Sequence, residues 1–426
     1  MRGARQVGKT TAVEIFAREF DNFIELNLEK KTDFDFFERD LPVRELVDAI
    51  LLSKNISLKK GRTLIFIDEI QNSHKAVAIL RYFYESTPEY HIIAAGSLLE
   101  IMMTKHDIGF PVGRVEYRFM YPLTFHEYLQ AMGLEQAVKY YTTLPCPDMA
   151  IETLKDLFHK YSMVGGMPEI VAKYSEEENV AALSLLYQSL ITSFQDDVKK
   201  YAHSDTMVEV ISHAIESAPL EAGNRIKFHG FGNSNYRSRE MGDALRNLQR
   251  AMLVYLVYPI TGVEPPALPN KRKSPRLQFI DTGLLAYGAG IQSLFYENKD
   301  LHSIYNGKIV EHIAGQEIIA RNGRSPDSYN FWVKEKKQSN SEIDFIVQYR
   351  DKFIPVEVKA GATGTLRSLH QFMNEADHVY AVRMYSGKLS VDTVQTTDGK
   401  KFFLLNLPYC FAGRLYEYIA WFVEGH

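Results

Sequence analysis

Residues Gly3 to Thr10, near the start of the chain, have types and a spacing that can hold phosphate groups. They read G-A-R-Q-V-G-K-T and fit the pattern G-x-x-x-x-G-K-[ST], in which loop amides, a lysine and a hydroxyl surround the phosphates of a nucleotide. Apolar residues at helical spacing follow directly, so Gly8 and Lys9 are expected at a helix N-terminus, where the backbone attracts anions. The pattern predicts a nucleotide site whose phosphates contact the following residues: Gly3, Gln6, Val7, Gly8, Lys9, Thr10 and Thr11.

Two consecutive carboxylates, Asp68 and Glu69, form the second signal. They stand at the end of the apolar run TLIFIDE. A strand that ends in this way lets Asp68 and the Thr10 hydroxyl hold Mg²⁺, while Glu69 acts as base on a water beside the terminal phosphate. Taken alone, such a strand end is often only a solvated one. Combined with the phosphate loop, it predicts a site that hydrolyses the nucleotide.

Two further residues are candidates for the same site. Ser97, in AAGSLL at the end of the next apolar run, either hydrogen-bonds the attacking water or the γ-phosphate, or caps a helix. Arg114, which follows a glycine in PVGRVEYRF, either serves as an arginine finger toward a neighbouring subunit or is solvated or paired on the surface. The first alternative for Arg114 implies a homo-oligomer.

The elements that must position these residues are short strands alternating with helices. Strand-like runs lie at residues 23–28, 63–68 and 91–97, with helical stretches between them. This order predicts an α/β domain with a parallel sheet covered by helices. A phosphate loop normally connects a strand to a helix, yet only two residues precede Gly3.

The C-terminal region contains a second group of residues that can do chemistry. The segment SEIDFIVQYRDKFIPVEVKAG predicts a β-hairpin that turns at Arg350 and Asp351, which places Asp344 opposite Glu357. Glu357 and Lys359 are two residues apart and therefore share a face of their strand. Carboxylates that bind Mg²⁺ beside a lysine that orients water suit phosphodiester hydrolysis, and a helix upstream offers Glu311 as a further carboxylate. The alternative is a hairpin face that is merely solvated.

The middle of the chain is mainly helical. Residues 205–260 suggest helices followed by a strand, the outline of a winged helix-turn-helix, and Arg239, Arg246 and Arg250 fall on one face of the second helix. These arginines either meet DNA phosphates or form a solvated helix face.

Composition limits the partners and the compartment. The net charge of −4 gives no overall attraction to nucleic acid or to a membrane surface. No apolar run reaches the roughly 18 residues that a membrane span requires. The two cysteines, Cys146 and Cys410, lie far apart without metal-ligand spacing, which suits a reducing compartment. We expect a cytoplasmic protein.

Several motifs together resemble one family. The chain contains, in order, GARQVGKTT, IFIDEIQ, AAGSLLE, GRVEYRFMYPLTFHEYL, VGGMPEIV, FIDTGLLAY, IDFIV and PVEVKAG. In these motifs it resembles the prokaryotic AAA-type ATP-binding proteins that carry a C-terminal domain of unknown function, and the likeness runs along nearly the whole chain.

The resemblance implies an α/β fold in four parts, with ATP and Mg²⁺ as cofactors. It implies an AAA-like P-loop NTPase domain of the additional-strand class at residues 1–130, expected to lack its first strand, and a helical lid at 131–204. A winged-helix segment at 205–275 and a restriction-endonuclease-like α/β domain at 276–426 follow. In the last domain Asp344, Glu357 and Lys359 fall in the D…E-x-K positions of the PD-(D/E)XK nuclease motif, with Glu311 as its helix acid.

The additional-strand class also implies where the strand before the phosphate loop lies. It is expected inside the sheet, between the strand that ends at Ser97 and the one through EYRFMYP, and Met1 and Arg2 are too short to supply it. Without that strand its two neighbours would each expose unpaired backbone groups. We therefore expect the natural chain to begin about 10 to 25 residues upstream, with an apolar strand of typical length directly before Gly3.

Two functions of different classes are compatible with these observations. The first is a Mg²⁺-dependent ATPase coupled to a nuclease directed at DNA. The second is a nucleotide-gated regulatory or binding protein whose nuclease-like tail recognises nucleic acid or a partner without cutting it. The D…E-x-K set favours the first, whereas the negative net charge and modest basic patches favour the second.

Overall fold

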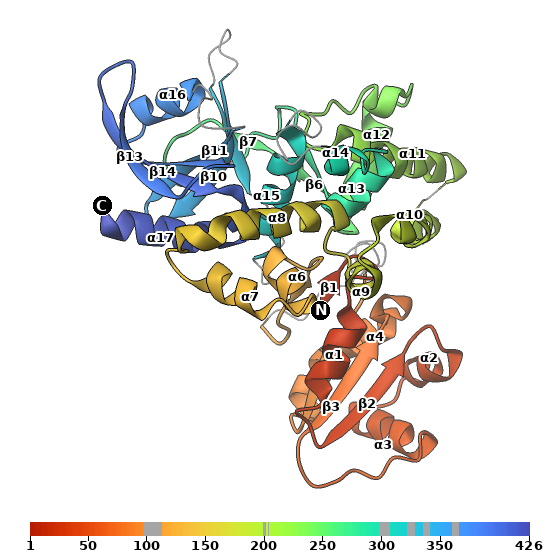
Figure 1. The fold of residues 1–426 in the computed structure, drawn as a ribbon. Helices are drawn as coiled ribbons and strands as arrows, with labels where there is room; N and C mark the ends of the chain where they lie inside the picture. The colour runs from red at the N-terminus through yellow and green to blue at the C-terminus, as the bar shows by residue number, and fades with distance from the viewer. Residues whose placement is uncertain are drawn as a thin grey trace. The chain divides into compact units, whose positions relative to one another are not determined.

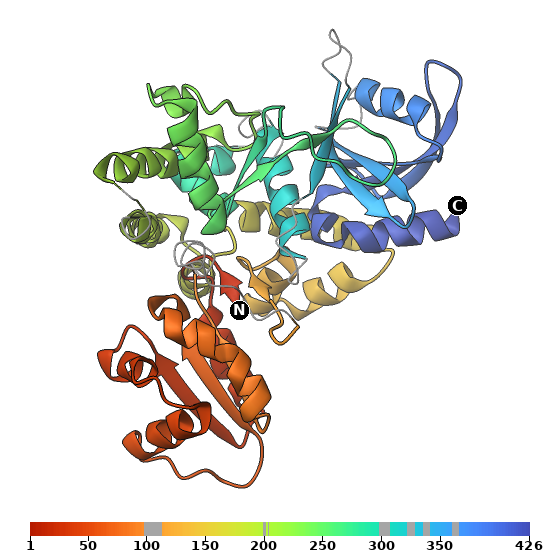
Figure 2. The same cartoon turned by 180° about the vertical axis from the view of Figure 1, so that it is seen from behind.

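The computed structural model describes residues 1–97, 113–198, 202, 204–297, 307–321, 329–334, 341–359 and 366–426. The chain divides into two compact units, formed mainly by residues 1–121 and 122–426. Figure 1 shows the chain from one side and Figure 2 from behind. None of the helices in the described ranges combines the length and the apolar character that crossing a membrane would require.

The first unit is built on three parallel strands in the order β2-β3-β4. Every residue of the central strand is buried, as expected for a strand covered on both faces. Ile65 and Ile67 pack with the helices of one face, whereas Leu64 and Phe66 pack with α1 on the other. The predicted parallel α/β sheet is therefore confirmed. Its elements are α1 (Lys9–Ala17), β2 (Asn22–Asn27), α2 (Lys31–Glu38), α3 (Val43–Ser53), β3 (Thr63–Asp68), η1 (Ile70–Asn72), α4 (His74–Ser86) and β4 (Tyr90–Ala94).

The start of the chain forms a two-residue strand at the position where a longer strand before the phosphate loop is expected. β1 (Arg2–Gly3) pairs in parallel with β5 (Phe119–Met120). On its other side Arg2 forms a bridge with Gly96, and the Met1 amine donates to the Ala94 carbonyl at 2.5 Å. The segment thus lies in the predicted place, between the strand after α4 and the one through EYRFMYP. Two residues form only part of such a ladder, and the expectation that an apolar strand of typical length precedes Gly3 in a longer natural chain stays a prediction.

The second unit contains a mixed sheet of seven strands in the order β13-β14-β12-β11-β10-β9-β7. Helix α16 (Arg367–Glu375) packs on the sheet through Leu369, Phe372 and Met373, which join one apolar cluster with strand residues such as Trp332 and Phe353. The strands are β7 (Pro259–Ile260), β9 (Asn330–Val333), β10 (Glu342–Tyr349), β11 (Lys352–Val358), β12 (Tyr380–Tyr385), β13 (Ser390–Gln395) and β14 (Lys401–Pro408).

Helices make up most of the rest of this unit, in agreement with the helical character predicted for the middle of the chain. Their bounds are α6 (Phe125–Ala131), α7 (Glu135–Thr142), α8 (Asp148–Val164), α9 (Pro168–Glu177), η2 (Val180–Leu183), α10 (Ser184–Val198), α11 (Asp205–Glu221), η3 (Phe231–Asn233), α12 (Ser238–Arg250), α13 (Thr282–Gly288), α14 (Leu294–Glu297), α15 (Lys308–Ala320), η5 (Tyr409–Arg414) and α17 (Leu415–Gly425).

The segment predicted as a winged helix, 205–275, contains α11, α12 and β6, and its partner strand β8 begins directly after it. β6 (Val254–Val257) pairs with β8 (Arg276–Phe279). Helix α12 buries its apolar residues and exposes Arg239 and Arg246, although Arg246 also forms an ion pair with Asp243 at 2.7 Å. The winged-helix assignment and the four-part division of the chain stay predictions.

The hairpin of β10 and β11 has the predicted register. Phe345 pairs with Val356, and the ladder continues to Tyr349 and Lys352, which flank the turn. Arg350, in that turn, has φ of 55°, the left-handed conformation that tight hairpin turns use. The register places Asp344 and Glu357 at neighbouring positions of the two strands.

Candidate functional site

The phosphate loop leads directly into α1, which begins at Lys9. Gln6 and Gly8 have φ of 63° and 89°, so the loop turns through left-handed conformations just before the helix. The Lys9 ammonium is buried and donates to the carbonyls of Gly3 at 3.1 Å and Ala4 at 2.8 Å. The lysine therefore lies across the loop whose phosphate it is predicted to bind.

The other loop residues differ in burial and in the space around them, and therefore in whether their side chain or only their backbone can contact a phosphate. Gly3 is required, because a Cβ there would lie 2.6 Å from the Met120 carbonyl oxygen. Val7 is fully buried, so only its backbone is suited to a phosphate, while Gln6 and Thr11 are exposed.

Thr10 and Asp68 meet at the carboxyl end of β3. The Thr10 hydroxyl donates to Asp68 Oδ2 at 2.7 Å, and Asp68 Oδ1 accepts from the Glu69 amide at 2.9 Å. A hydroxyl and a carboxylate side by side are hard oxygen ligands of the kind that Mg²⁺ prefers. The donor set of these two residues therefore fits the predicted magnesium ion.

Glu69 has a partner that the sequence did not suggest. Glu69 itself has φ of 53°, and Gln71 Nε2 donates a hydrogen bond to Glu69 Oε2. Burial raises the pKa of Glu69, while the hydrogen bond from Gln71 acts in the opposite direction. Gln71 Oε1 is buried without a hydrogen-bond partner among the described residues, and a Cβ on Gly96 would lie 2.2 Å from it. The only sequence signal was a glutamine two positions after the glutamate.

The two additional candidates of this unit lie in different settings. Ser97 is buried, and the residues directly after it lie outside the described ranges, so the choice between its predicted role at the nucleotide site and a helix cap stays open. Arg114 forms an ion pair with Glu85 at 2.8 Å, with both side chains partly exposed. This contact is the paired surface arrangement that the sequence offered as the alternative to an arginine finger.

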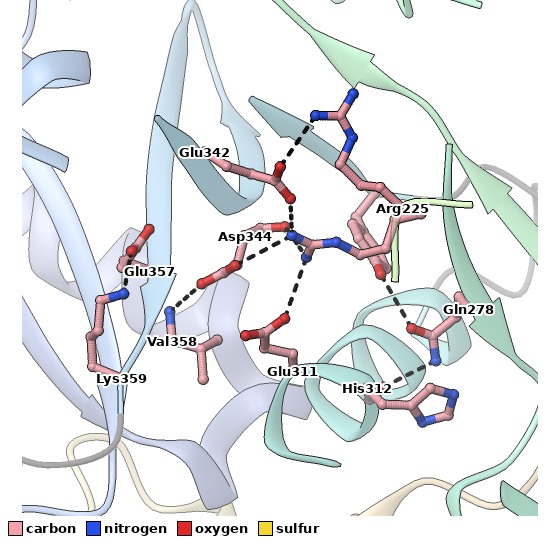
Figure 3. Close-up of polar contacts among 11 residues, drawn as sticks. Arg225, Gln278, Glu311, His312, Glu342, Asp344, Glu357, Val358 and Lys359 are labelled. Atoms are coloured by element: carbon pink, nitrogen blue, oxygen red, sulfur yellow. Dashed lines mark hydrogen bonds and ion pairs between the residues drawn. The ribbon is translucent and has the colours of Figure 1, made fainter. Parts of the chain in front are cut away.

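In the second unit, β10, β11 and α15 bring together the predicted nuclease-like residues. Glu357 Oε1 and the Lys359 ammonium form an ion pair at 2.6 Å, and Asp344 Oδ2 accepts from the Val358 amide at 2.8 Å. Glu311 comes from α15, and Figure 3 shows its carboxylate directed toward the same region as that of Asp344. The predicted convergence of carboxylates and a lysine is therefore present.

A buried arginine, Arg276, lies among these carboxylates. Its Nη2 is 3.4 Å from Asp344 Oδ1 and also donates to Glu342 Oε1, while its Nη1 is 3.8 Å from Glu311 Oε2. Arg225 contacts the second oxygen of Glu342 at 3.6 Å (Figure 3). We call Arg276, Glu311, Glu342 and Asp344 the arginine–carboxylate cluster.

The arginine–carboxylate cluster does not fit a divalent metal ion as it is arranged. Its carboxylates are directed at the guanidinium, and Asp344 uses both oxygens, one on Arg276 and one on the Val358 amide. Across the described parts of the chain, no three His, Cys, Asp or Glu side chains are placed to hold a metal ion together. The sequence missed Arg276 because it ends a basic run, KRKSPR, that is typical of a solvated loop.

Burial and neighbouring charges shift the pKa values of two cluster residues, Glu311 and Arg276, and of the adjacent Glu357. Burial, with the nearby charge of Asp344, raises the pKa of Glu311 to about 8, and Arg276 opposes this effect. Burial and Asp344 likewise raise the pKa of Glu357 to about 8, against the influence of Lys359. Burial disfavours the guanidinium charge, but the surrounding carboxylates outweigh it and raise the pKa of Arg276. The cation is thus held by the acids around it.

A neutral polar layer attaches β8 to α15 beside the cluster. The Phe279 amide donates to His312 Nε2 at 3.1 Å, and Gln278 Nε2 donates to the His312 carbonyl at 3.0 Å (Figure 3). Burial lowers the pKa of His312 to about 3, so the ring is neutral and accepts this hydrogen bond. These contacts fix Arg276 on β8 relative to Glu311 on α15.

Comparisons with known proteins give matches to three family models. Residues 1–129 match an AAA domain, residues 155–294 match a domain of unknown function, DUF8612, and residues 306–408 match another, DUF4143. No curated protein matches the chain.

Among the matching solved structures is a mutant of RuvB from Thermotoga maritima. It is 15% identical, covers 60% of this chain and 81% of its own, and superposes with a TM-score of 0.23. The AAA domain match agrees with the α/β P-loop architecture of the first unit. Together with the DUF4143 match, it supports an AAA-type protein with a C-terminal domain of unknown function.

Proposed function

We propose that this protein is a Mg²⁺-dependent ATP-hydrolysing protein whose nuclease-like C-terminal domain acts on nucleic acid. The observation that carries the proposal is the contact between the Thr10 hydroxyl and Asp68 Oδ2 at 2.7 Å, at the N-terminus of the helix that Lys9 begins. The AAA domain match over residues 1–129 supports the nucleotide part.

The residues of the first unit divide the work of ATP hydrolysis among them. The loop amides and Lys9 hold the phosphates, and Thr10 and Asp68 hold Mg²⁺, which offsets phosphate charge when bound. Glu69 accepts a proton from the water that attacks the γ-phosphorus, while the bond to the β–γ bridging oxygen breaks and gives ADP and phosphate. In this proposal Ser97 orients that water. Arg114 leaves Glu85 to reach the nucleotide of a neighbouring subunit.

Two substitutions test the nucleotide site. Lys9→Ala should abolish ATP binding, because the buried cation that meets the phosphates is lost, whereas Glu69→Gln should leave binding intact and stop hydrolysis. The matched control is Lys31→Ala, which removes an exposed lysine from the start of α2. Equal ATP binding by the native protein and Lys9→Ala in calorimetry would refute the assignment.

For the second unit, the proposal assigns phosphodiester cleavage to Asp344, Glu357 and Lys359, in an arrangement in which the guanidinium of Arg276 no longer occupies the carboxylates that would hold the metal ion. Asp344→Ala or Glu357→Ala should erase cleavage of single- or double-stranded DNA or RNA in Mg²⁺ or Mn²⁺ without changing ATP turnover. Lys359→Ala should lower the cleavage rate more than the metal affinity. Cleavage that survives both carboxylate substitutions would exclude the hairpin as the active site.

A second candidate function is supported by the buried position of Arg276. The position of Arg276 among the carboxylates favours a nucleotide-gated regulatory protein with a catalytically inert tail that binds DNA or a partner. In both candidates the exposed Arg239 and Arg246 of α12, with Arg250 at its end, contact DNA phosphates. Replacing Arg239 and Arg246 by alanine should then weaken DNA binding and reduce its salt dependence.

A further inference from the structure

The arginine–carboxylate cluster contains a cation supplied by the chain itself. Arg276 is 5% exposed, and it contacts carboxylates from two other elements, Glu311 on α15 and both Glu342 and Asp344 on β10. The guanidinium also lies 4.9 Å from the centre of the Phe331 ring, a distance at which aromatic rings attract cations. The arginine is therefore held on several sides.

The same oxygens would be needed by a divalent cation. In the nuclease-like arrangement, the metal would be held by Asp344, Glu357 and Glu311. Within these carboxylates, Asp344 Oδ1 and Glu311 Oε2 are paired with the guanidinium at 3.4 and 3.8 Å, and Asp344 Oδ2 already accepts from the Val358 amide. Glu357 Oε2, in contrast, is buried and has no hydrogen-bond partner in the described ranges. One predicted ligand atom is thus unsatisfied, and two are occupied by the arginine.

We propose that Arg276 closes this metal site: its guanidinium and a divalent cation compete for Asp344 Oδ1 and Glu311 Oε2, and the cluster binds a metal only when the guanidinium is absent or withdrawn. The proposal rests on the nuclease-like site of the proposed function and adds a constraint on it. Placing a divalent cation beside a guanidinium would bring like charges together in a buried space, where repulsion is poorly screened.

The competition is tested by titrating MnCl₂ into the full chain, without nucleotide, in a calorimeter. The proteins compared are the native chain and Arg276→Met, each with and without Asp344→Asn, which removes a charge from the proposed site. Arg276→Met should bind one Mn²⁺ that Asp344→Asn abolishes, at least about ten-fold more tightly than any Asp344-dependent binding by the native chain.

Arg225→Met is the matched control. Arg225 also contacts Glu342, but its side chain is 37% exposed and its contact is at the edge of the cluster. Its loss should leave Mn²⁺ binding like that of the native chain. If the native chain binds an Asp344-dependent Mn²⁺ as tightly as Arg276→Met does, or if neither binds it, the competition is refuted.

A second variant covers the case in which Arg276→Met does not fold. Arg276→Lys keeps one positive charge, but the compact ammonium cannot span the contacts that the forked guanidinium makes. Its Asp344-dependent Mn²⁺ affinity should exceed that of the native chain, and Mn²⁺ should raise its melting temperature. Equal affinities of Arg276→Lys and the native chain would overturn the proposal.

A nuclease assay of the same proteins separates this proposal from the proposed function. If Arg276→Met binds Mn²⁺ through Asp344 and still does not cut nucleic acid, the nuclease function fails while the competition holds. If the native chain both cuts and binds Mn²⁺ with full affinity, the nuclease function holds while the competition fails.

Discussion

The phosphate loop and the arginine–carboxylate cluster both place a buried cation at a predicted catalytic site, but they hold it in different ways. Lys9 donates to the carbonyls of Gly3 and Ala4, and Asp68 pairs with the Thr10 hydroxyl. Arg276, in contrast, is surrounded by ionised or ionisable carboxylates. A hydrogen bond that involves a charged group contributes about 1.5–3 kcal/mol, whereas removing one member of a buried ion pair costs about 3–5 kcal/mol. Breaking one contact between Lys9 and a loop carbonyl is therefore expected to cost less than removing Arg276 from its carboxylates.

The largest expected effect concerns the metal dependence of ATP turnover. EDTA should stop turnover, and Mg²⁺ should restore it. Asp68→Asn should lower turnover by about 100-fold or more, because the carboxylate that helps to hold Mg²⁺ is lost. Asp344→Asn should leave the Mg²⁺ dependence unchanged, because the cluster does not serve the nucleotide.

The measurement is phosphate release as a function of Mg²⁺ concentration for the native chain and both variants. If Asp344→Asn shifts the Mg²⁺ dependence as much as Asp68→Asn does, the two sites are not independent and the comparison fails.

The next effect concerns stability. Arg276→Met should lower the free energy of unfolding by about 3–5 kcal/mol, because it leaves buried carboxylates without their counter-charge. Arg225→Met should cost less than about 1 kcal/mol, because Arg225 is partly exposed and screened by solvent. Denaturant unfolding of both variants at neutral pH checks the difference. Equal losses would mean that the cluster is not held together by its buried arginine.

Another buried carboxylate, Glu317 on α15, extends the comparison to an acid without an ion-pair partner in the described ranges. Its Oε1 accepts from the Phe125 amide at 2.9 Å and the Tyr161 hydroxyl at 2.8 Å, while its Oε2 is buried and unsatisfied among the described residues. Burial raises the pKa of Glu317 to about 7. The ionisable groups around it and across the adjoining cavity are His126, Glu127, Tyr141, Tyr161, Arg321, Arg414 and Glu417.

Because the pKa of Glu317 is higher in the folded state than its ordinary value of 4.5, its protonated form stabilises the fold. That contribution is complete below about pH 4.5 and is lost as the pH rises through about 7. Between pH 5 and 8, the native chain should lose about 2–3 kcal/mol of stability relative to Glu317→Gln. Parallel pH dependences of the two proteins in urea unfolding would contradict this expectation.

Contiguous patterns explain what the sequence predicted well. The spacing of Gly8, Lys9 and Thr10 fixes them at a helix start, and the apolar strand before Glu69 brings Asp68 to the same edge. The hairpin register followed from one turn and the two-residue period of strands. In each case, local geometry decides which side chains meet.

Long-range contacts explain what the sequence missed. Arg276 meets Glu342 and Asp344 across 66 and 68 residues, and nothing near Arg276 in the sequence distinguishes a buried arginine from a solvated one. Likewise, the pairing of Arg2 and Gly3 with β5 uses only backbone groups and does not depend on side-chain type. Backbone pairing and the burial of a charge both depend on the tertiary fold, so a pattern of residue types does not reveal them.

The smallest expected effect concerns Gln71, whose uncharged side-chain amide contacts Glu69, the predicted base of the nucleotide site. Gln71 Nε2 donates to Glu69 Oε2, so it orients the carboxylate without bringing a charge. Gln71→Met keeps the length of the side chain and removes the donor. Because a single hydrogen bond to a charged group contributes about 1.5–3 kcal/mol at most, and part of that is recovered by water, we expect kcat to fall by about five- to ten-fold. The KM for ATP should not change, since Gln71 positions the base and does not bind the phosphates.

Steady-state ATP turnover of Gln71→Met, Gln71→Glu and the native chain checks whether the effect is on kcat and not on KM. A rise in KM with kcat unchanged would show that Gln71 supports the loop that binds the nucleotide and not the base.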